Sequence, residues 1–350
     1  FITVGTPANS DGSADLTYVE AVSREIAQSM SGYLLVVEKS TVPVNTCSWI
    51  KQILGTYNKN GSEFDVASVP EFLREGSAVE DFLRPSRIVI GTENPKAEKI
   101  LQDLFAPLNA PVIGVDIKSA ELIKHASNSF LALKISYINA VANICERVGA
   151  DVVKVAKAMG LDPRIGPAFL QAGVGYGGSC FPKDLAAFAN LGSQIGYEFG
   201  LLHEVARINQ QQTSLVVDKL KESLGVLSGK RIGVLGLAFK PQTDDIREAP
   251  ALSIIAGLLA EGVVVKCYDP VAMPGARGVF GEQITYCLDP YDLAEGCDAL
   301  VLVTEWPQFG ELDFKKIKGL VSRPVLVDGR NFLDPDQMGA LGFEYRGIGR

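Results

Sequence analysis

Apolar residues in the first third of the chain fall into short compact runs and one stretch with helical spacing. Residues 16–30 carry apolar positions at helical intervals, whereas the compact runs have the length and composition of strands. The strand-like runs are 1–4, 33–38, 87–91 and 111–115. Strands that alternate with helices predict a parallel sheet, whose ligand lies at the carboxyl ends of the strands. The segments 5–7 and 39–41 follow two such ends.

The pattern changes near residue 118, after which helical spacing dominates to about residue 224. Within 119–146, Lys124 and Asn128 lie four residues apart and therefore on one helix face. Strand-like runs then return at 231–235, 263–268, 299–303 and 324–327. The sequence predicts two α/β domains joined by a helical middle.

The charge and the cysteines argue against several classes of function. A formal net charge of −8 disfavours nucleic acid as a partner, since phosphate binding needs a basic surface. The six cysteines are scattered and only two histidines are present, so we expect no metal site. No apolar run approaches the roughly 18 residues of a membrane span, so we expect a cytoplasmic protein with reduced thiols and no membrane partner.

The most informative stretch is 173–184, which reads GVGYGGSCFPKD. Its four glycines allow the backbone to approach a ligand closely. Pro182 suits the first turn of a helix, so Cys180 lies just before a helix N-terminus, with Lys183 nearby. Both features favour the thiolate and predict a nucleophilic cysteine. The alternative is a glycine-rich turn with an incidental buried thiol.

A cysteine nucleophile usually works with a histidine base, as in cysteine proteases and acyl transferases. Neither His125 nor His203 stands in a recognisable motif. Lys183 and Asp184 are instead the titratable neighbours of Cys180 in sequence. This pairing fits water activation and charge stabilisation better than protease chemistry.

The decapeptide GYGGSCFPKD (175–184) resembles the active-site signature of the UDP-glucose/GDP-mannose dehydrogenase family. Further stretches resemble other motifs of that family in the same order and cover almost the whole chain. They are EKSTVPV (38–44), PEFLREG (70–76), ELIKHASNSFLA (121–132), LAFKPQTDDIREAP (237–250) and DGRNFLDP (328–335). Phe181 and the DDIREAP wording resemble the bacterial-type members that act on UDP-glucose.

The resemblance implies a three-part α/β fold. Residues 1–117 would form a partial N-terminal Rossmann domain that binds NAD, 118–228 a helical central dimerisation domain, and 229–350 a C-terminal Rossmann-like domain that binds the UDP-sugar. The implied activity is the NAD-dependent, four-electron oxidation of UDP-glucose to UDP-glucuronate by a homodimer or a higher homo-oligomer. Alternatives are a dehydrogenase of GDP-mannose or another sugar nucleotide, and a non-catalytic fragment that binds a sugar nucleotide.

The resemblance also assigns catalytic roles residue by residue. Cys180 would take the aldehyde as a thiohemiacetal and then carry the thioester that water cleaves. Lys124 and Asn128 would steady the oxyanion, a role that their shared helix face permits. Asp184, together with Lys124, would help to deprotonate the substrate hydroxyl through water.

Two further positions match residues beside the nicotinamide. Glu75 would assist thioester hydrolysis, and the Thr41 hydroxyl would touch the cofactor and an ordered water. The residues expected to contact NAD are Thr6, Pro7, Thr41, Glu75, Lys183 and Arg247. The residues expected to contact the sugar nucleotide are Phe72, Leu73, Arg74, Lys124, Arg164, Phe169, Leu170, Gln171, Ala172, Gly173, Gly177, Phe239, Lys240 and Arg330. Arg164 would do so across the dimer interface.

Each of these residues also has a plain structural interpretation. Lys124 alone would be a solvated residue on a helix face, and Glu71 and Glu75, four apart, would be surface carboxylates of a helix. Arg247 would form a capping ion pair with a neighbouring aspartate. Arg330 would be a turn residue after Asp328.

One motif of the family is missing from these 350 residues. The dinucleotide fingerprint, a GxGxxG after the first strand of the cofactor domain, is expected before Phe1. We therefore expect an N-terminally truncated cofactor domain and a chain impaired in NAD-dependent turnover.

Overall fold

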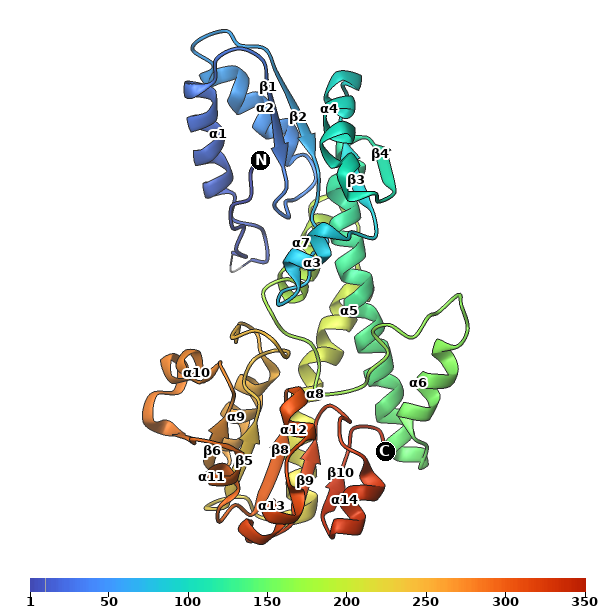
Figure 1. Cartoon of the computed structure of the whole chain (residues 1–350), viewed down its shortest axis with the longest axis vertical. Helices are drawn as coiled ribbons and strands as arrows, with labels where there is room; N and C mark the ends of the chain where they lie inside the picture. Colours follow the sequence, from blue (N-terminus) through green and yellow to red (C-terminus); the bar gives the residue numbers. More distant parts are fainter. Residues whose placement is uncertain (10) are drawn as a thin grey trace. The chain divides into compact units, whose positions relative to one another are not determined.

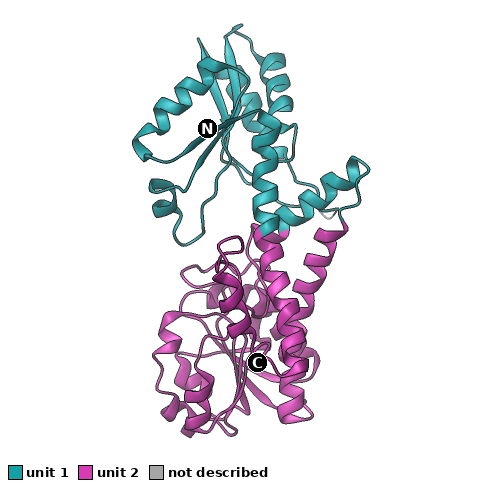
Figure 2. Cartoon of the chain, turned by 90° about the vertical axis from the view of Figure 1, so that its right-hand side faces the viewer, with its two compact units in different colours: residues 1–130, 183–199 teal, residues 131–182, 200–350 magenta. Residues whose placement is uncertain are grey.

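The computed structural model describes residues 1–9 and 11–350. It divides the chain into two compact units (Figure 2). Unit 1 comprises Phe1–Phe130 and Lys183–Phe199, and unit 2 comprises Leu131–Pro182 and Gly200–Arg350. The long helices α5 (Ile117–Val148) and α7 (Phe181–Gln194) each contribute residues to both units. We describe each unit by itself.

Unit 1 is built on a four-stranded sheet of order β1-β2-β3-β4 (Figure 1). The strands are β1 (Leu34–Glu38), β2 (Phe64–Ser68), β3 (Ile88–Gly91) and β4 (Val112–Val115). The helices before α5 are α1 (Thr17–Ser29), α2 (Thr46–Tyr57), α3 (Ala78–Leu83), α4 (Pro95–Phe105) and the 3₁₀ turn η1 (Ala106–Leu108). The pairs β1–β2 and β3–β4 are parallel, whereas β2 and β3 meet through one antiparallel pair, Ser68 with Gly91.

The two faces of this sheet follow from the two-residue period of a strand. Val36 and Val66 share one apolar cluster with residues of α1 and α2. Val37 and Ala67, the next residue on each strand, share another with Leu101 and Phe105 of α4. Helices therefore cover both faces, as expected for a mainly parallel sheet whose strands are apolar on both sides.

Unit 2 contains a six-stranded, wholly parallel sheet of order β10-β9-β8-β5-β6-β7. The strands are β5 (Arg231–Leu235), β6 (Val264–Tyr268), β7 (Thr285–Tyr286), β8 (Ala299–Leu302), β9 (Val325–Asp328) and β10 (Glu344–Arg346). Besides α5 and α7, the helices are α6 (Val152–Gly160), α8 (Gly200–Leu224), α9 (Pro250–Ala260), α10 (Met273–Phe280), η2 (Gly281–Gln283), α11 (Pro290–Ala294), α12 (Pro307–Gly310), α13 (Phe314–Leu320) and α14 (Pro335–Leu341).

The strand order of unit 2 contains a topological switch point. From β5 the chain continues to β6 and β7 on one side, and it then returns to β8 on the other side of β5. Crevices for ligands in such sheets lie at the carboxyl ends of the strands where the order reverses. The turn after Leu235 and the segment after Leu302 therefore border the expected ligand crevice of this unit.

The structure confirms the α/β class and the parallel sheets predicted from the sequence. It does not form a strand over the whole of residues 1–4: only Ile2 makes a parallel bridge, to Glu38. The strands β2, β7 and β10 were not predicted. Among the described residues, no helix combines the length and apolarity of a membrane span. No group of three potential metal-binding side chains is found in the same residues.

Candidate active site

Lys124 and Asn128 lie on one face of α5 in unit 1, and both are buried. The Lys124 ammonium donates to Oε1 of Glu71 at 2.8 Å and lies 5.6 Å from the centroid of the Phe72 ring. The Asn128 amide donates to Oδ2 of Asp184 at 2.6 Å. Lys124 is thus no solvated surface residue, because a buried ammonium requires the carboxylate that it meets.

Asp184 joins α7 to this group. It lies in the first turn of α7 and is 1% exposed. Its second oxygen, Oδ1, accepts a hydrogen bond from the Lys183 ammonium at 2.8 Å. One buried carboxylate therefore meets an amide and a cation, and unit 1 brings four predicted residues together: Lys124, Asn128, Lys183 and Asp184.

The segment that follows β2 supplies Glu71 and is not helical. Glu71 accepts the Lys124 bond with one oxygen and the N–H of Leu73 with the other, at 2.6 Å. The plain interpretation of Glu71 as a surface carboxylate of a helix is wrong, because its segment is not helical and its carboxylate binds Lys124. In the sequence, the only pattern around Glu71 is its spacing of four residues from Glu75. That pattern cannot indicate Lys124 as a partner, because Lys124 lies 53 residues away. Glu75 itself is half-buried.

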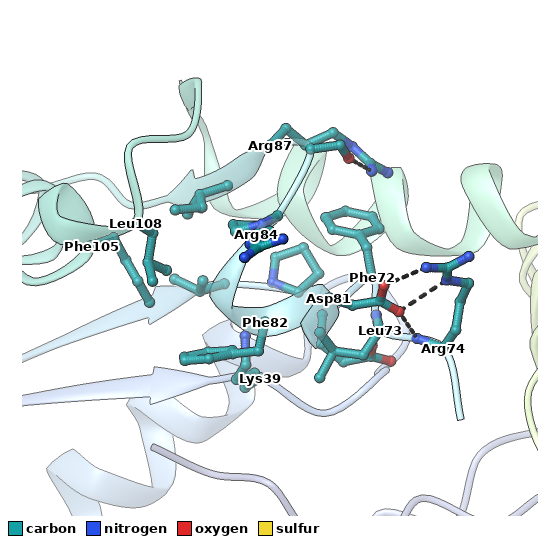
Figure 3. A pocket seen from close by; sticks show the side chains of 16 residues that line it. Lys39, Phe72, Leu73, Arg74, Asp81, Phe82, Arg84, Arg87, Phe105 and Leu108 are labelled. Atoms are coloured by element: carbon teal, nitrogen blue, oxygen red, sulfur yellow. Dashed lines mark hydrogen bonds and ion pairs between the residues drawn. The ribbon is translucent and has the colours of Figure 1, made fainter. Parts of the chain in front are cut away.

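The same loop lines a cavity of about 320 Å³ in unit 1 (Figure 3). Arg74 points towards Asp81 and binds its carboxylate through Nε and Nη2, at 3.0 and 2.6 Å. The Arg87 guanidinium carbon lies 3.7 Å from the centroid of the Phe72 ring. The side chains of Phe72 and Arg74 are therefore held by neighbours within unit 1, and the loop is ordered by its own contacts.

Two predicted cofactor contacts are linked at the carboxyl end of β1. The Thr6 hydroxyl donates to the backbone carbonyl of Thr41 at 2.8 Å, and Thr6 is buried. Glu38, the last residue of β1, accepts the N–H of Ser40 at 2.7 Å, and burial raises the pKa of Glu38 to about 7. Pro7 is exposed. The segments after residue 4 and after β1 are thereby tied to one another.

Helix α5 also fixes the chain that follows Thr41. Nε2–H of the buried His125 donates to the carbonyl of Val42 at 2.9 Å, and burial lowers the pKa of this histidine. The Glu121 carboxylate accepts the N–H groups of Asn45 and Cys47 at 2.7 and 2.8 Å, which caps the start of α2. His125 is therefore a buried structural link between α5 and the segment that follows β1.

Cys180 belongs to unit 2 and immediately precedes α7, as predicted, and its side chain is exposed. All six cysteines lie in the described residues, and the other five are buried. Gly178 adopts a φ of +83°, and a Cβ there would lie 2.7 Å from the Phe239 ring. A Cβ on Gly177 would overlap the carbonyl of Glu248. The glycines before Cys180 are thus required by packing as well as by conformation.

Ten of the residues predicted to hold the sugar nucleotide lie in unit 2, whereas Phe72, Leu73, Arg74 and Lys124 lie in unit 1. Leu170, Ala172, Gly173 and Gly177 are buried, Gln171 is exposed, and Phe169 is half-buried with a left-handed φ of +65°. Non-glycine residues in this region store strain and gather at functional sites. The φ of Phe169 thus agrees with a ligand-binding segment.

The turn after β5 carries Phe239 and Lys240, and both are half-buried beside the switch point. The Lys240 ammonium lies 5.5 Å from the centroid of the Phe239 ring. Arg330 follows β9, and its guanidinium donates to the carbonyls of Val303 and Gly175 at 2.7 and 2.9 Å. Arg330 is therefore more than a turn residue, since it links three segments of unit 2.

Two predicted arginines are exposed and face aspartates of their own segments. Arg164 binds Asp162, two residues earlier, and its side chain is 87% exposed. Arg247 binds Asp245 at 2.7 Å, which agrees with the ion-pair alternative stated for it. The roles of Arg164 and Arg247 in ligand binding remain predictions.

Three segments of the chain match the domains of one protein family. Residues 1–109 match the NAD binding domain of the UDP-glucose/GDP-mannose dehydrogenase family, residues 118–211 its central domain, and residues 233–335 its UDP binding domain. These ranges together span most of the chain.

Comparison with individual proteins indicates the same family. The UDP-glucose 6-dehydrogenase TuaD of Bacillus subtilis is 49% identical over 350 residues, which are 100% of this chain and 76% of the relative. The UDP-glucose 6-dehydrogenase of Pseudomonas aeruginosa is 45% identical over 362 residues and is covered to 80%. The solved structure of a UDP-glucose dehydrogenase from Pyrobaculum islandicum superposes with a TM-score of 0.92 at 43% identity, covering 100% of this chain and 79% of that one. The chain therefore belongs to the UDP-glucose/GDP-mannose dehydrogenase family.

Proposed function

We propose that the chain catalyses the NAD-dependent oxidation of UDP-glucose to UDP-glucuronate. The observation that carries the proposal is the exposed Cys180 at the start of α7, the helix whose first turn bears the buried Asp184. A thiol that accepts an aldehyde must be open to the substrate, and Cys180 is the exposed one. Relatives named as UDP-glucose 6-dehydrogenases, at 49% and 45% identity, support this substrate.

The chemistry proceeds in two oxidations and one hydrolysis. The C6 alcohol loses a hydride and a proton to become the aldehyde, and the Cys180 sulfur adds to its carbonyl carbon to form a thiohemiacetal. Loss of a second hydride and a proton gives the thioester. Water then adds to the thioester carbonyl, which releases the carboxylate and regenerates the thiol. NAD, when bound, supplies the hydride-accepting capacity for each oxidation.

Residues of unit 1 would handle the charge and the protons. An Asn side chain has two amide N–H groups, so Asn128 can bind Asp184 with one and stabilise the oxyanion with the other. The Lys124 ammonium, held by Glu71, would stabilise the same negative charge. Asp184 would take the proton of the alcohol through water, and Glu75 would assist hydrolysis of the thioester.

The residues of unit 1 fit an NAD site at the carboxyl ends of its strands. The bond from the Thr6 hydroxyl to the Thr41 carbonyl joins the segments that follow residue 4 and β1. The Thr41 hydroxyl makes no hydrogen bond with any described residue, which leaves it for a ligand or water. The residues of unit 1 that would hold NAD are Thr6, Pro7, Thr41, Glu75 and Lys183.

The sugar nucleotide would bind in unit 2 at the switch point between β5 and β8. Lys240 lies on the turn after β5, where a cation suits a diphosphate. Phe239, Arg330 and the segment 169–173 would complete that site. Arg164 of a partner subunit would reach the same ligand.

The proposal predicts a fixed stoichiometry. The purified full-length protein, given limiting UDP-glucose and excess NAD, is expected to form two NADH per sugar, because the thioester route carries two oxidations. NADH is measured by absorbance at completion, and UDP-glucuronate by mass spectrometry.

A panel with GDP-mannose and UDP-N-acetylmannosamine provides the substrate control. The proposal expects the kcat/KM for UDP-glucose to exceed that for each of the others. Equal or better kcat/KM with GDP-mannose would assign a different substrate. One NADH per sugar, with the aldehyde as product, would remove the thioester route.

We propose further that two copies of the chain form a homodimer through α5. Tyr137, Ile144 and Val148 lie on α5 at spacings of seven and four residues, and their exposed fractions are 52%, 59% and 70%. This spacing places them on one face of the helix, as in the contact face of a helix pair. Exposed apolar side chains that gather on one face indicate an interaction site.

Ile144→Glu is expected to weaken the dimer about 100-fold or more, since a two-fold interface receives each new charge twice and a buried charge without a partner is costly. Sedimentation equilibrium measures the dissociation constant. Ser214→Glu is the matched control, because Ser214 is an exposed residue of another long helix, α8. An unchanged dimer with Ile144→Glu would place the interface elsewhere.

A further inference from the structure

The segment before Cys180 has no helix or strand, yet its backbone is extensively bonded. Residues 171–180 form only bends and irregular chain. Backbone N–H and C=O groups in buried segments must find partners, and a loop without a sheet or helix must take them from elsewhere. In this segment most partners are side chains of other elements.

Asn209 on α8 provides two of these bonds to one residue. Its Oδ1 accepts the N–H of Tyr176 at 2.9 Å, and its Nδ2 donates to the carbonyl of Tyr176 at 3.0 Å. The amide therefore pairs with Tyr176 as a neighbouring strand would. Gly175 makes the approach possible: its φ is +98°, and a Cβ there would lie 2.7 Å from the Asn209 oxygen.

A second pair of amides holds Gly173, three residues earlier. Asn139 of α5 accepts the N–H of Gly173 at 2.9 Å, and Gln212 of α8 donates to its carbonyl at 3.0 Å. Both amides are completely buried. Gln212 also accepts a bond from Asn143 at 3.0 Å, which fixes the orientation of its amide.

The bonds continue towards Cys180. The N–H of Gly178 donates to the carbonyl of Arg247 at 2.9 Å. The ring of Tyr176 packs edge-on against the ring of Phe181, with centroids 5.8 Å apart. Phe181 is the first residue of α7 and follows Cys180 directly. A shift of Tyr176 would thus move the residue next to the sulfur.

From these contacts we propose that Asn209 is a positioning residue for Cys180. Its amide replaces the missing strand neighbour of the loop and fixes Tyr176, and Tyr176 in turn holds the start of α7 through Phe181. Asn139 and Gln212 secure the other end of the loop at Gly173. The inference rests on the proposed role of Cys180 as nucleophile, and it adds a residue that touches neither the sulfur nor a ligand.

The glycine content of the loop explains why its backbone needs hydrogen bonds from side-chain amides. The loop 173–178 contains four glycines, and glycine has more backbone freedom to lose than any other residue. A reacting atom displaced by about 1 Å can lose roughly 100-fold in rate. A flexible loop that carries a nucleophile therefore needs fixed partners for its backbone, and side-chain amides offer both a donor and an acceptor.

The test uses Asn209→Ala, with Gln210→Ala as the matched control. Gln210 is exposed on the same helix, and its side chain makes no hydrogen bond with the described residues. In Asn209→Ala we expect kcat for UDP-glucose to fall about 10- to 100-fold while KM stays within about 3-fold. Hydrogen exchange at the Tyr176 amide is expected to accelerate at least about 10-fold, because its acceptor is gone. Gln210→Ala should match the wild type in both measurements.

Asn209→Asp separates positioning from loss of fold. The aspartate keeps an acceptor for the Tyr176 N–H but loses the donor for its carbonyl. We expect exchange at Tyr176 to stay near the wild-type rate, with kcat between those of wild type and Asn209→Ala. Wild-type kcat and exchange in a folded Asn209→Ala variant would overturn the inference. If the wild type itself did not oxidise UDP-glucose, the proposed function would fail. Even then, unchanged hydrogen exchange at Tyr176 in Asn209→Ala would reject the proposal that Asn209 holds the loop.

Discussion

The Cys180→Ala variant is expected to lose net production of UDP-glucuronate by about 10⁴-fold or more, while binding UDP-glucose within a few fold of wild type. Removing a covalent nucleophile normally costs several orders of magnitude, because the intermediate that it carries can no longer form. Cys180 is exposed at the start of α7, so alanine fits without a change in packing. NADH formation measures turnover, and calorimetry measures binding.

Cys145→Ala is the control for loss of a thiol. Cys145 is a buried residue of α5 in an apolar cluster with Ile138 and Val152. It is expected to retain kcat and to lose only stability. A Cys180→Ala variant that kept more than about a tenth of the wild-type rate would reject covalent catalysis by this residue.

The second large effect is expected at Asn128. Asn128→Ala removes the amide that meets Asp184 at 2.6 Å and that would face the oxyanion. Loss of one preorganised oxyanion donor lowers kcat by about 100- to 1,000-fold in other enzymes. We therefore expect kcat to fall far more than KM rises, as measured in steady-state assays with UDP-glucose varied.

Ser127→Ala is the neighbouring control on α5. The Ser127 hydroxyl makes no hydrogen bond with any described residue, so its removal should leave kcat and KM near the wild-type values. If Asn128→Ala raised KM and left kcat unchanged, Asn128 would instead bind substrate and transition state equally.

Much of the fold could be predicted because most strands are compact apolar runs. The predicted run 231–235 coincides with β5, and 299–303 differs from β8 (Ala299–Leu302) by one residue. β2 could not be predicted in this way, because Asp65 interrupts it. The structure explains the exception: Asp65 accepts bonds from the Tyr33 hydroxyl and the Asn94 amide, and these partners are distant in sequence.

In the candidate site, too, features set by local sequence could be predicted, and features set by contacts distant in sequence could not. The shared face of Lys124 and Asn128 follows from local helical geometry, and so does the place of Cys180 before a helix opened by Pro182. The pairing of Lys124 with Glu71 depends on how α5 meets the end of β2, and no local pattern encodes that meeting. Asn209 was missed for the same reason, since an amide on a helix has no distinctive sequence pattern until its partner is known.

The packing at Gly177 limits how this protein could be redesigned. Because a Cβ would overlap the carbonyl of Glu248, even alanine would force the backbone of Glu248, itself at a φ of +51°, out of place. In a randomised library that includes Gly177, most variants at this position would therefore have a misfolded loop. Phe72 and Leu73 are half-buried and are predicted contacts of the sugar nucleotide, and Phe72 meets the side chains of Arg87 and Lys124, so a search for altered sugar preference would gain more from varying those two positions.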